Sequence, residues 1–581
     1  MIRKLMFRLL PVQVLIIAAG TINLIVSSYF ATNYLGTDAM SAVGLYGPVN
    51  MLLNAVTLML VGGTTIICGE CIGQNRQAKL QESYSLSIIL SFIVAIVFAA
   101  IMLILAANDA TGFLTKDMTV RPILNRYIMG QAIGMVPFIL SNQFASFLFI
   151  ENKGRITQIA IAVFIAVNLV LNYLFVAVMG MDAFGLALAS SLSTWVYLLA
   201  EAWHFISGRS FLKFKLIRPD LRECLSIIRI GLPGALINGY QTVRGLVVNH
   251  LVEVYVGAAG ISAFATANNL LALFWAIPVG MQTVSRLLMS VAIGEEDRKS
   301  LTEVMRNAIR YYTPLMFAIS TVLMLSAQTL TYIFYKDPSE PVFMMTVWGF
   351  RILPFCMPLA IFTMHYVIYS QASNKQRIVH VLTVFDGMIS VSVFTALLIP
   401  RLGMNSVYIA NVANGVVSIL IVIIYATLCN RHFPRSMDEL MVIPDDFGAA
   451  DDEFAEIKVT SLSEAVCVSR HIQEFCLSKG IDTRRSHYAA LAAEEMVVNV
   501  VEHGFVKDNK NHSVDIRVVC KNDSVIIRIK DDCQPFDPAE RNHLAKNGDA
   551  VSNIGIRMVY SIAEEIQYHN IFGLNVLTIK I

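Results

Sequence analysis

The sequence predicts an all-α membrane body of twelve transmembrane helices joined to a C-terminal α/β sandwich. Hydropathy and charge carry this prediction. The 581 residues are 56% apolar and 15% charged, with a mean hydropathy of +0.62, whereas soluble domains carry about 25% charged residues. Residues 445–581 hold 15 Lys+Arg and 22 Asp+Glu, a net charge of −7, and residues 1–444 hold 29 and 20, a net charge of +9. A wholly soluble protein is therefore excluded, and at least two domains are required.

Twelve stretches of the body are long and apolar enough to cross a bilayer. A span needs about 20 mostly apolar residues, and its backbone groups must be satisfied within the segment, so each span is expected to be a helix. The expected spans are residues 10–32, 44–69, 84–107, 122–149, 156–179, 183–207, 227–255, 261–292, 307–334, 341–370, 378–400 and 403–429.

The connections between these spans differ in their content of Lys and Arg. One side collects most of them, including Arg76, Lys153, Lys213 and Lys375, whereas the other holds little more than Lys116, Arg121, Lys336 and Arg401. The positive-inside rule places the basic side in the cytosol. With an even number of spans, we expect a multi-pass protein of the inner (plasma) membrane with both termini in the cytoplasm.

The body contains an internal repeat. Tyr34-Leu35-Gly36 recurs as Tyr255-Val256-Gly257, and Asn152-Lys153-Gly154-Arg155-Ile156 recurs as Asn374-Lys375-Gln376-Arg377-Ile378. We therefore divide the chain into a body at 1–435, with six-helix repeats at about 8–215 and 225–430, a linker at 436–453 and a tail at 454–581. Such parallel repeats place a substrate site between two lobes and favour a secondary carrier over a channel or receptor.

These residues resemble a known family. The run from Gly36 to Gly73, the second repeat opening with Gly231-Leu232-Pro233, and the links "ENKGRIT" and "SNKQRIV" are similar to the multidrug and toxic compound extrusion (MATE) transporters. The resemblance covers about residues 8–430. It implies a V-shaped pair of lobes in the lipid bilayer and export of small organic, often cationic, compounds coupled to entry of H⁺ or Na⁺.

The resemblance also implies positions for the transport site. The first-helix acid of the family falls on Ile25-Val26-Ser27-Ser28, so Ser28 is the polar residue expected there, and the Asn-x-x-x-Asp pair of the fifth helix reads Asn168 and Asn172. The Thr of the sixth helix corresponds to Ser190, and a Glu of the seventh helix corresponds to Gln241. Asn and Gln hydrogen-bond but take up no proton near neutral pH, so the family's usual coupling acids are replaced.

Two ionisable residues lie near the middle of expected spans. Arg244 falls in span 227–255 and Asp386 in span 378–400. A charge at mid-bilayer costs at least about 2.5–3.5 kcal/mol on insertion scales, so such residues face a cavity or a partner. Two interpretations stand side by side: the residues pair with each other in the second lobe, or they are unrelated groups that face a cavity.

The tail alternates between helix and strand patterns. After a strand at Val459 we expect helices at 461–479 and 484–504, strands at 514–519 and 525–529 joined by a turn at 521–523, a helix at 552–565 and a last strand at 575–581. Helices on one face of a mainly antiparallel sheet form an α/β sandwich.

The chemistry of the tail concentrates in the helical motif "LAAEEMVVNVVEHG". Glu495, Asn499 and His503 are spaced by four and share one face. A carboxylate and an amide one turn apart can orient a water and a phosphate-bound metal ion, although a solvated polar face would produce the same pattern. Together with "IKDDCQPFDP" and "SNIGIRMVYSIAEEIQYHN", the motif resembles the histidine-kinase-type (GHKL) ATP-binding domain, most of all the bacterial anti-sigma-factor serine kinases.

This second resemblance covers about residues 455–581 and implies a site for ATP and Mg²⁺. Asn499 would hold Mg²⁺, Glu495 would be the general base, Asp531 would accept from the adenine amino group, and Gly555 would let the backbone approach the phosphates, with His503 at the same site. The glycine of the family's Asp-x-Gly is Cys533 here. Since no GxxxxGK[ST] P-loop occurs, an ATP-binding-cassette engine is disfavoured.

We therefore expect a drug-exporting H⁺ or Na⁺ antiporter with a regulatory nucleotide-binding tail. The tail would sense ATP, hydrolyse it or phosphorylate a Ser/Thr of an anti-anti-sigma-like or other regulatory protein. The alternatives are a transport-inactive membrane sensor whose tail is a protein kinase, or a tail that only binds protein. Nucleic acid is not an expected partner, because the soluble part is acidic.

Overall fold

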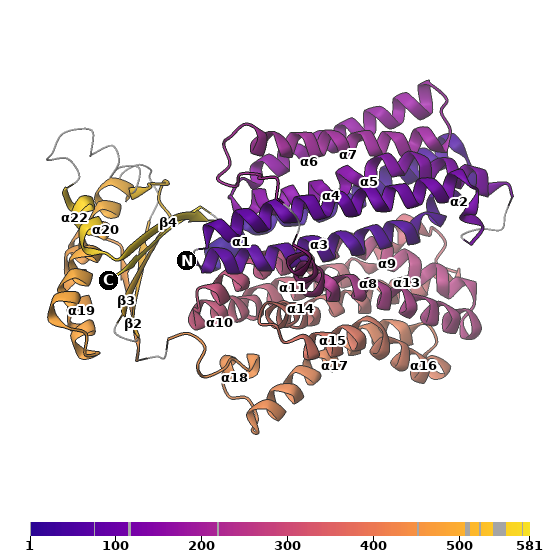
Figure 1. Ribbon diagram of the computed structural model, residues 1–581. Helices are drawn as coiled ribbons and strands as arrows, with labels where there is room; N and C mark the ends of the chain where they lie inside the picture. The colour runs from indigo at the N-terminus through magenta and orange to yellow at the C-terminus, as the bar shows by residue number, and fades with distance from the viewer. Residues whose placement is uncertain are drawn as a thin grey trace. The chain divides into compact units, whose positions relative to one another are not determined.

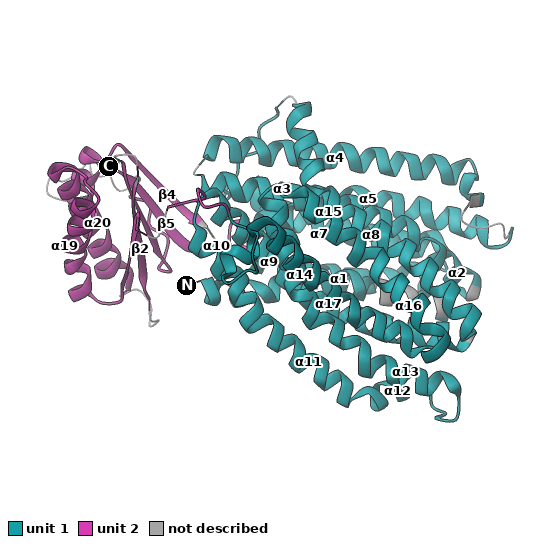
Figure 2. Cartoon of the chain, turned by 90° about the horizontal axis from the view of Figure 1, so that it is seen from below, with its two compact units in different colours: residues 1–148, 154–443 teal, residues 149–153, 444–581 magenta. Residues whose placement is uncertain are grey.

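A computed structural model describes most of the chain, and its two compact units are shown in Figure 2. One unit comprises residues 1–148 and 154–443, and the other comprises residues 149–153 and 444–581. The described residues are 2–74, 76–113, 118–217, 220–449, 452–505, 512–521, 524–538, 554–571 and 573–581. Each unit is considered on its own below.

The first unit is a bundle of long helices (Figure 1). Its N-terminal half contains α1 (Ile2–Phe30), α2 (Thr37–Leu45), α3 (Gly47–Gly73), α4 (Gln77–Ala107), α5 (Val120–Ile150), α6 (Gly154–Asn172) and α7 (Ala183–Ile206). Short helical pieces of other types follow three of these helices, namely η1 (Ala31–Leu35), η2 (Ala110–Phe113) and η3 (Tyr173–Val178). We call this half lobe one.

The C-terminal half of the first unit, lobe two, repeats the arrangement. It contains α8 (Leu221–Tyr255), α9 (Ala258–Gly294), α10 (Arg298–Asn307), η4 (Ala308–Tyr312), α11 (Thr313–Leu325), α12 (Ala327–Phe334), α13 (Pro341–Ile352), η5 (Leu353–Phe355), α14 (Cys356–Ala372), α15 (Gln376–Val384), η6 (Phe385–Ile389), α16 (Ser390–Leu402) and α17 (Asn405–Asn430). Gly36 and Gly257 share a φ of 89°, and Asn152 and Asn374 share a φ of 56°. The sequence repeat is therefore also a repeat of backbone conformation.

The number of spans agrees closely with the expectation. Within the described residues, 11 helical segments are long and apolar enough to cross a membrane. The remaining expected span, 227–255, does form a helix within α8, but Arg229, Arg244 and Glu253 interrupt its apolar surface. The helical membrane fold is confirmed, with one helix more polar than its neighbours.

Helix α3 joins the two lobes through unusually close packing. A Cβ atom at Gly231 of α8 would overlap the carbonyl oxygen of Met59, and one at Gly63 of α3 would overlap the carbonyl oxygen of Ile227. At the C-terminal ends of α3 and α9, Gly73 and Gly294 approach each other's helices in the same way. Only glycine allows backbones to come this close, so the lobes are tightly held together at this end.

The segment after α17 remains attached to lobe two. Helix α18 (Met437–Met441) is preceded by the N-cap residue Ser436, whose side chain accepts a hydrogen bond from the Glu439 amide, as N-cap residues do. The Lys375 Nζ donates to the carbonyl oxygens of Met441, at 2.9 Å, and Val442. The compact unit thus extends to 443, beyond the boundary expected at 435.

The second unit is an α/β sandwich with a five-stranded antiparallel sheet. Its elements are β1 (Phe454–Val459), α19 (Leu462–Ser478), α20 (Thr483–Gly504), β2 (Val514–Lys521), β3 (Ser524–Asp531), α22 (Ile554–Ile562), β4 (Glu565–Ile571) and β5 (Leu574–Lys580). The strand order is β1-β2-β3-β5-β4, and every neighbouring pair is antiparallel. The helices lie on one face of the sheet (Figure 1), and a continuous apolar core fills the space between them.

One expectation for this unit was wrong. Residues 552–565 were expected to be helical, but α22 ends at Ile562, and Glu565–Ile571 form an edge strand that pairs with β5. The hairpin turns at Gly573, which has a φ of 72°. Pairing with a strand further along the chain outweighs the helical preference of the Ala563-Glu564-Glu565 run. Of the turn expected at 521–523, residues 522–523 lie outside the described part.

Candidate functional site

Lobe one contains a buried cluster of four polar side chains, and three of them, Asn168, Asn172 and Ser190, were expected from the sequence. Asn168 Nδ2, on α6, donates to Ser190 Oγ of α7 at 3.4 Å, and Ser190 Oγ lies 3.3 Å from Ser27 Oγ of α1. Asn172 Nδ2 donates to the Asn168 carbonyl oxygen at 2.8 Å and to its Oδ1 at 3.1 Å. All four side chains are buried. The side chain of Ser28 lies outside the described part, and its neighbour Ser27 joins the cluster.

An aromatic cavity of about 600 Å³ lies beside this cluster. Its walls come from α1, η1, α6 and η3, the elements that carry or directly follow the cluster residues. It is lined by Val26, Tyr29, Phe30, Tyr34, Leu169, Val170 and Tyr173. Aromatic faces attract cations through their quadrupoles, and apolar walls with a few polar groups are typical of small-molecule sites. The cavity therefore has the chemistry of a site for an organic cation.

Lobe two holds a second polar cluster around Asp386. The Asp386 Oδ1, on η6, accepts hydrogen bonds from Asn414 Nδ2 at 2.8 Å and Ser418 Oγ at 3.4 Å, both on α17. Arg244 Nη1, on α8, lies 3.5 Å from the Asp386 backbone carbonyl oxygen. The two residues are neighbours, as one interpretation expected. The Arg244 guanidinium contacts the Asp386 backbone carbonyl, however, while the Asp386 carboxylate accepts its hydrogen bonds from α17. Gln241 lies one turn before Arg244 on an exposed part of α8.

Sequence reasoning did not single out two ionisable residues that lie inside the helical bundle of the membrane unit. Glu201 of α7 is fully buried beside Thr157 and Tyr197. Arg286 of α9 packs its guanidinium against Gly62 of α3. Glu201 falls near the end of span 183–207, where charged side chains usually reach the interface. The available signal was that Glu201 is the one carboxylate within residues 183–207.

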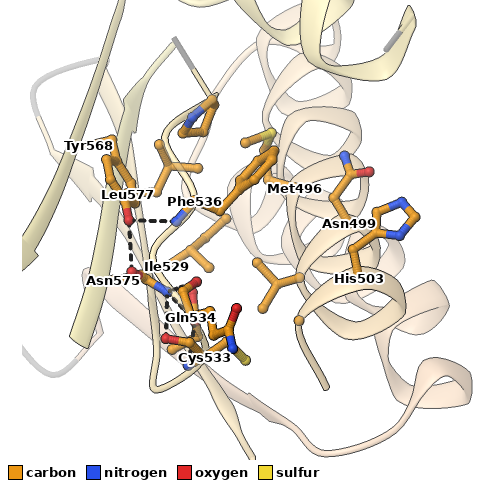
Figure 3. Close-up of a pocket in the computed structure, with 14 residues that line it drawn as sticks. Met496, Asn499, His503, Ile529, Cys533, Gln534, Phe536, Tyr568, Asn575 and Leu577 are labelled. Atoms are coloured by element: carbon orange, nitrogen blue, oxygen red, sulfur yellow. Dashed lines mark hydrogen bonds between the residues drawn. The ribbon is translucent and has the colours of Figure 1, made fainter. Parts of the chain in front are cut away.

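The second unit contains a pocket between α20 and the sheet (Figure 3). Asn499 and His503 project side by side from α20, whereas Asp531 ends β3 and Cys533 follows it. The residues that line the pocket are Met496, Asn499, Val500, His503, Gly504, Ile529, Asp531, Cys533, Gln534, Phe536, Pro538, Tyr568, Asn575 and Leu577. Three of the expected nucleotide residues, Asn499, His503 and Asp531, therefore meet in one place.

Asp531 is held at the base of this pocket by hydrogen bonds. Its Oδ1 accepts from the Cys533 amide at 2.9 Å and from Asn575 Nδ2 at 2.7 Å. Asn575 Oδ1 in turn accepts from the Tyr568 hydroxyl at 2.7 Å, and the Tyr568 oxygen accepts from the Phe536 amide at 2.9 Å. Burial raises the pKa of the Asp531 carboxyl, and the hydrogen bonds from Asn575 and Cys533 oppose that rise.

Glu495 and Gly555 lie together next to this pocket rather than in its wall. A Cβ atom at Gly555, in the first turn of α22, would overlap the Glu495 Oε2 atom. Gly555 thus allows α22 to approach α20. The resemblance implied a different role, in which Gly555 lets the backbone approach the phosphates of the nucleotide. The segment 539–553, which precedes α22, lies outside the described part.

Comparisons with known families agree with this architecture. A family model described as MatE matches residues 15–174 and 233–397, which is more than half of the chain. The chain belongs to the MATE family. A second model, described as a histidine kinase-like ATPase domain, matches residues 460–581. Both resemblances stated from the sequence are confirmed: this is a MATE transporter domain followed by a histidine kinase-like ATPase domain.

Individual relatives of the MATE domain are distant. The chain is 23% identical over 346 residues to the "Probable multidrug resistance protein NorM" of Halalkalibacterium halodurans, spanning 56% of this chain and 70% of that protein. It is 24% identical over 326 residues to the "Multidrug export protein MepA" of Staphylococcus haemolyticus, spanning 54% and 69%.

Solved structures show the same fold. An outward-facing multidrug resistance MATE transporter of the MOP superfamily matches with a TM-score of 0.67 at 22% identity, over 72% of this chain and 93% of that chain. A MOP superfamily transporter from Pyrococcus furiosus, described as having a binding pocket of reversed polarity, matches with a TM-score of 0.66 over 72% and 94%. At this identity the similarity establishes the MATE fold.

Proposed function

We propose that the MATE domain exports small organic, drug-like cations by antiport against H⁺ or Na⁺. The observation that carries this proposal is the aromatic cavity of lobe one beside the buried cluster of Ser27, Asn168, Asn172 and Ser190. At exposed sites an aromatic ring stabilises a cation by about 0.5–1 kcal/mol, and the neighbouring amides can orient its polar groups. The printed names of the relatives, multidrug resistance and multidrug export proteins, support the same substrate class.

The coupling ion in this proposal acts at a carboxylate outside the lobe-one cluster. Asn168 and Asn172 are amides and take up no proton. Asp386 is a half-buried carboxylate on η6 of lobe two, and Glu201 is a fully buried carboxylate on α7 of lobe one. An ionisable residue inside a membrane helix marks an ion or proton path by default, so we assign proton or sodium binding to Asp386 first and Glu201 second.

The proposed transport cycle rocks the lobes about α3. The contacts of Gly73 and Gly294 hold the lobes together at one end of α3 and α9. The distribution of Lys and Arg assigns this end to the cytosol. In that orientation the described conformation is closed toward the cytosol, and export requires the lobes to separate there to load substrate.

For the C-terminal domain we propose binding of Mg-ATP in the pocket beneath α20. The residues present fit the adenine end of the nucleotide: a buried carboxylate at Asp531 for the amino group, and Phe536 and Leu577 for the ring. The Asn499 amide oxygen is a hard ligand suited to Mg²⁺. Glu495 would polarise the attacking hydroxyl or water. Bound nucleotide would report the energy state of the cell, or supply a phosphoryl group to a Ser/Thr of a regulatory protein.

The alternative is a transport-inactive sensor whose cytosolic domain is a protein kinase. The specific observation in its favour is that the lobe-one cluster consists of hydroxyls and amides where the family usually has acids. A sensor would bind the ligand in the same cavity and move no ion.

Reconstituted protein distinguishes the two proposals. Proteoliposomes loaded with a fluorescent organic cation are given an H⁺ or Na⁺ gradient, with and without Mg-ATP. An antiporter moves the cation when the gradient is imposed, and Asp386→Asn abolishes the movement. Binding of the cation without movement under any gradient would favour the sensor. Titration of the full chain with Mg-ATP tests the second domain separately.

A further inference from the structure

Three different metal-binding side chains meet at one corner of the ATPase domain. The imidazole of His512, the carboxylate of Asp532 and the thiol of Cys533 each offer a ligand atom, and these atoms all lie within 4.8 Å of one another. The His512 Nδ1 and the Asp532 Oδ1 are 2.9 Å apart. His512 and Cys533 are buried, and Asp532 is half-buried.

The strand register explains why these residues meet. Strands β2 and β3 are antiparallel, and Val514 lies opposite Asp531. Residues just before β2 therefore lie beside residues just after β3, which brings His512 next to Asp532 and Cys533. The end of α20 closes the corner: the Phe505 ring packs on His512 with 5.7 Å between ring centres, and a Cβ atom at Gly504 would lie 3.0 Å from the Cys533 Sγ. The cluster is thus fixed by three elements.

We propose that His512, Asp532 and Cys533 bind a transition-metal ion of the Zn²⁺ class. One nitrogen, one carboxylate oxygen and one sulfur are ligands that Zn²⁺ accepts together, at about 2.0–2.3 Å. A thiol and an imidazole select against Mg²⁺ and Ca²⁺, which prefer oxygen ligands only. This site therefore differs in its ligand atoms from the proposed Mg²⁺ position at Asn499, and Cys533 also lines the nucleotide pocket. Three protein ligands leave a fourth tetrahedral position for water.

Metal binding at this corner acts on the residue expected to hold adenine. The Cys533 amide donates to Asp531 Oδ1, and the Cys533 thiol also hydrogen-bonds to the Asp531 side chain. When the ion binds, the sulfur–metal bond forms, the S–H bond breaks, and its proton passes to solvent. The thiolate no longer donates to Asp531, and the 531–533 turn is anchored to His512. This consequence rests on the proposed nucleotide site, whereas the metal site itself does not.

The metal site is tested on the purified full chain in detergent with its affinity tag removed. After incubation with Zn²⁺ and gel filtration, bound metal is counted by mass spectrometry. We expect about one bound ion per chain in the wild type, and at least a tenfold loss of zinc affinity in Cys533→Ser and in His512→Gln. Cys467→Ser is the matched control, because Cys467 is an exposed thiol on α19 of the same domain.

Cobalt gives an independent reading of the same ligands. Co²⁺ bound to the wild type should show thiolate-to-metal charge-transfer absorption, which Cys533→Gly removes and Cys467→Ser retains. Cys533→Gly restores the glycine of the family's Asp-x-Gly motif, so the domain is expected to fold, as checked by thermal unfolding. Wild-type protein without retained zinc, or a cobalt spectrum unchanged in Cys533→Gly, would overturn the proposal. Loss of Mg-ATP binding with zinc retained would instead overturn only the nucleotide site.

Discussion

Replacing Asp531 by asparagine separates nucleotide binding from folding. In the wild type one carboxylate oxygen is occupied by the Cys533 amide and Asn575, which leaves the other for the adenine amino group. In Asp531→Asn the amide oxygen must keep accepting from Cys533 and Asn575, so the new NH₂ group faces the adenine NH₂. Two donors then oppose each other, and no hydrogen bond forms.

The expected loss follows from the strength of one hydrogen bond to a charged group. Such a bond contributes about 1.5–3 kcal/mol, which corresponds to roughly ten- to hundredfold weaker binding of Mg-ATP. Unfolding should change little, because burial already disfavours the charged carboxylate and asparagine has the same shape. We expect a change of less than about 1 kcal/mol in the free energy of unfolding.

Calorimetric titration of the full chain in detergent measures the affinity, and thermal unfolding measures stability. Glu502→Gln is the control, since it removes the same charge at an exposed position of α20 and should bind Mg-ATP like the wild type. If Asp531→Asn binds Mg-ATP with unchanged affinity, the assignment of Asp531 to adenine is wrong.

Three further predictions concern acidity, helix packing and the segment after the last span. Because burial raises the pKa of Asp531, protonation should remove the adenine acceptor at a pH above the ordinary aspartate value of about 3.9. The dissociation constant of Mg-ATP should therefore rise as the pH falls through that raised pKa. The same pH dependence of the dissociation constant in Asp531→Asn would contradict this prediction. Gly231→Ala should lower the stability of the detergent-solubilised protein by about 1–3 kcal/mol, since its Cβ overlaps the Met59 carbonyl, whereas Gly239→Ala on the same helix has open space and should unfold at the wild-type temperature. Lys375→Met removes the hydrogen bonds to Met441 and Val442, so limited proteolysis near residues 436–443 should become faster than in the exposed control Arg377→Met; equal cleavage rates would show that Lys375 does not hold this segment.

Much of the fold could be predicted from sequence because the signals are local and repeated. Long apolar runs predicted the helices, and the recurrence of Gly36 at Gly257 predicted the two lobes. Strand β4 escaped prediction because Glu565–Ile571 follows a helix without a strong break, and its partner β5 lies beyond a turn. Local propensity cannot register such pairing.

The candidate sites were predictable where they rest on one helix or on a family motif. Asn168 and Asn172 are one turn apart on α6, and Asn499 and His503 are one turn apart on α20, so their proximity follows from helical spacing. The meeting of His512 with Cys533 depends on the β2–β3 register, and the burial of Glu201 depends on its packing against α6. Neither can be read from spacing along the chain.

We propose that an ion gradient, and not nucleotide, drives transport by this MATE domain. The most direct test is efflux of a fluorescent organic cation from proteoliposomes under an imposed H⁺ or Na⁺ gradient with no nucleotide present. We predict gradient-dependent efflux that persists in Glu495→Ala and Asn499→Ala. Efflux that requires Mg-ATP and proceeds without any ion gradient would show that nucleotide drives transport instead.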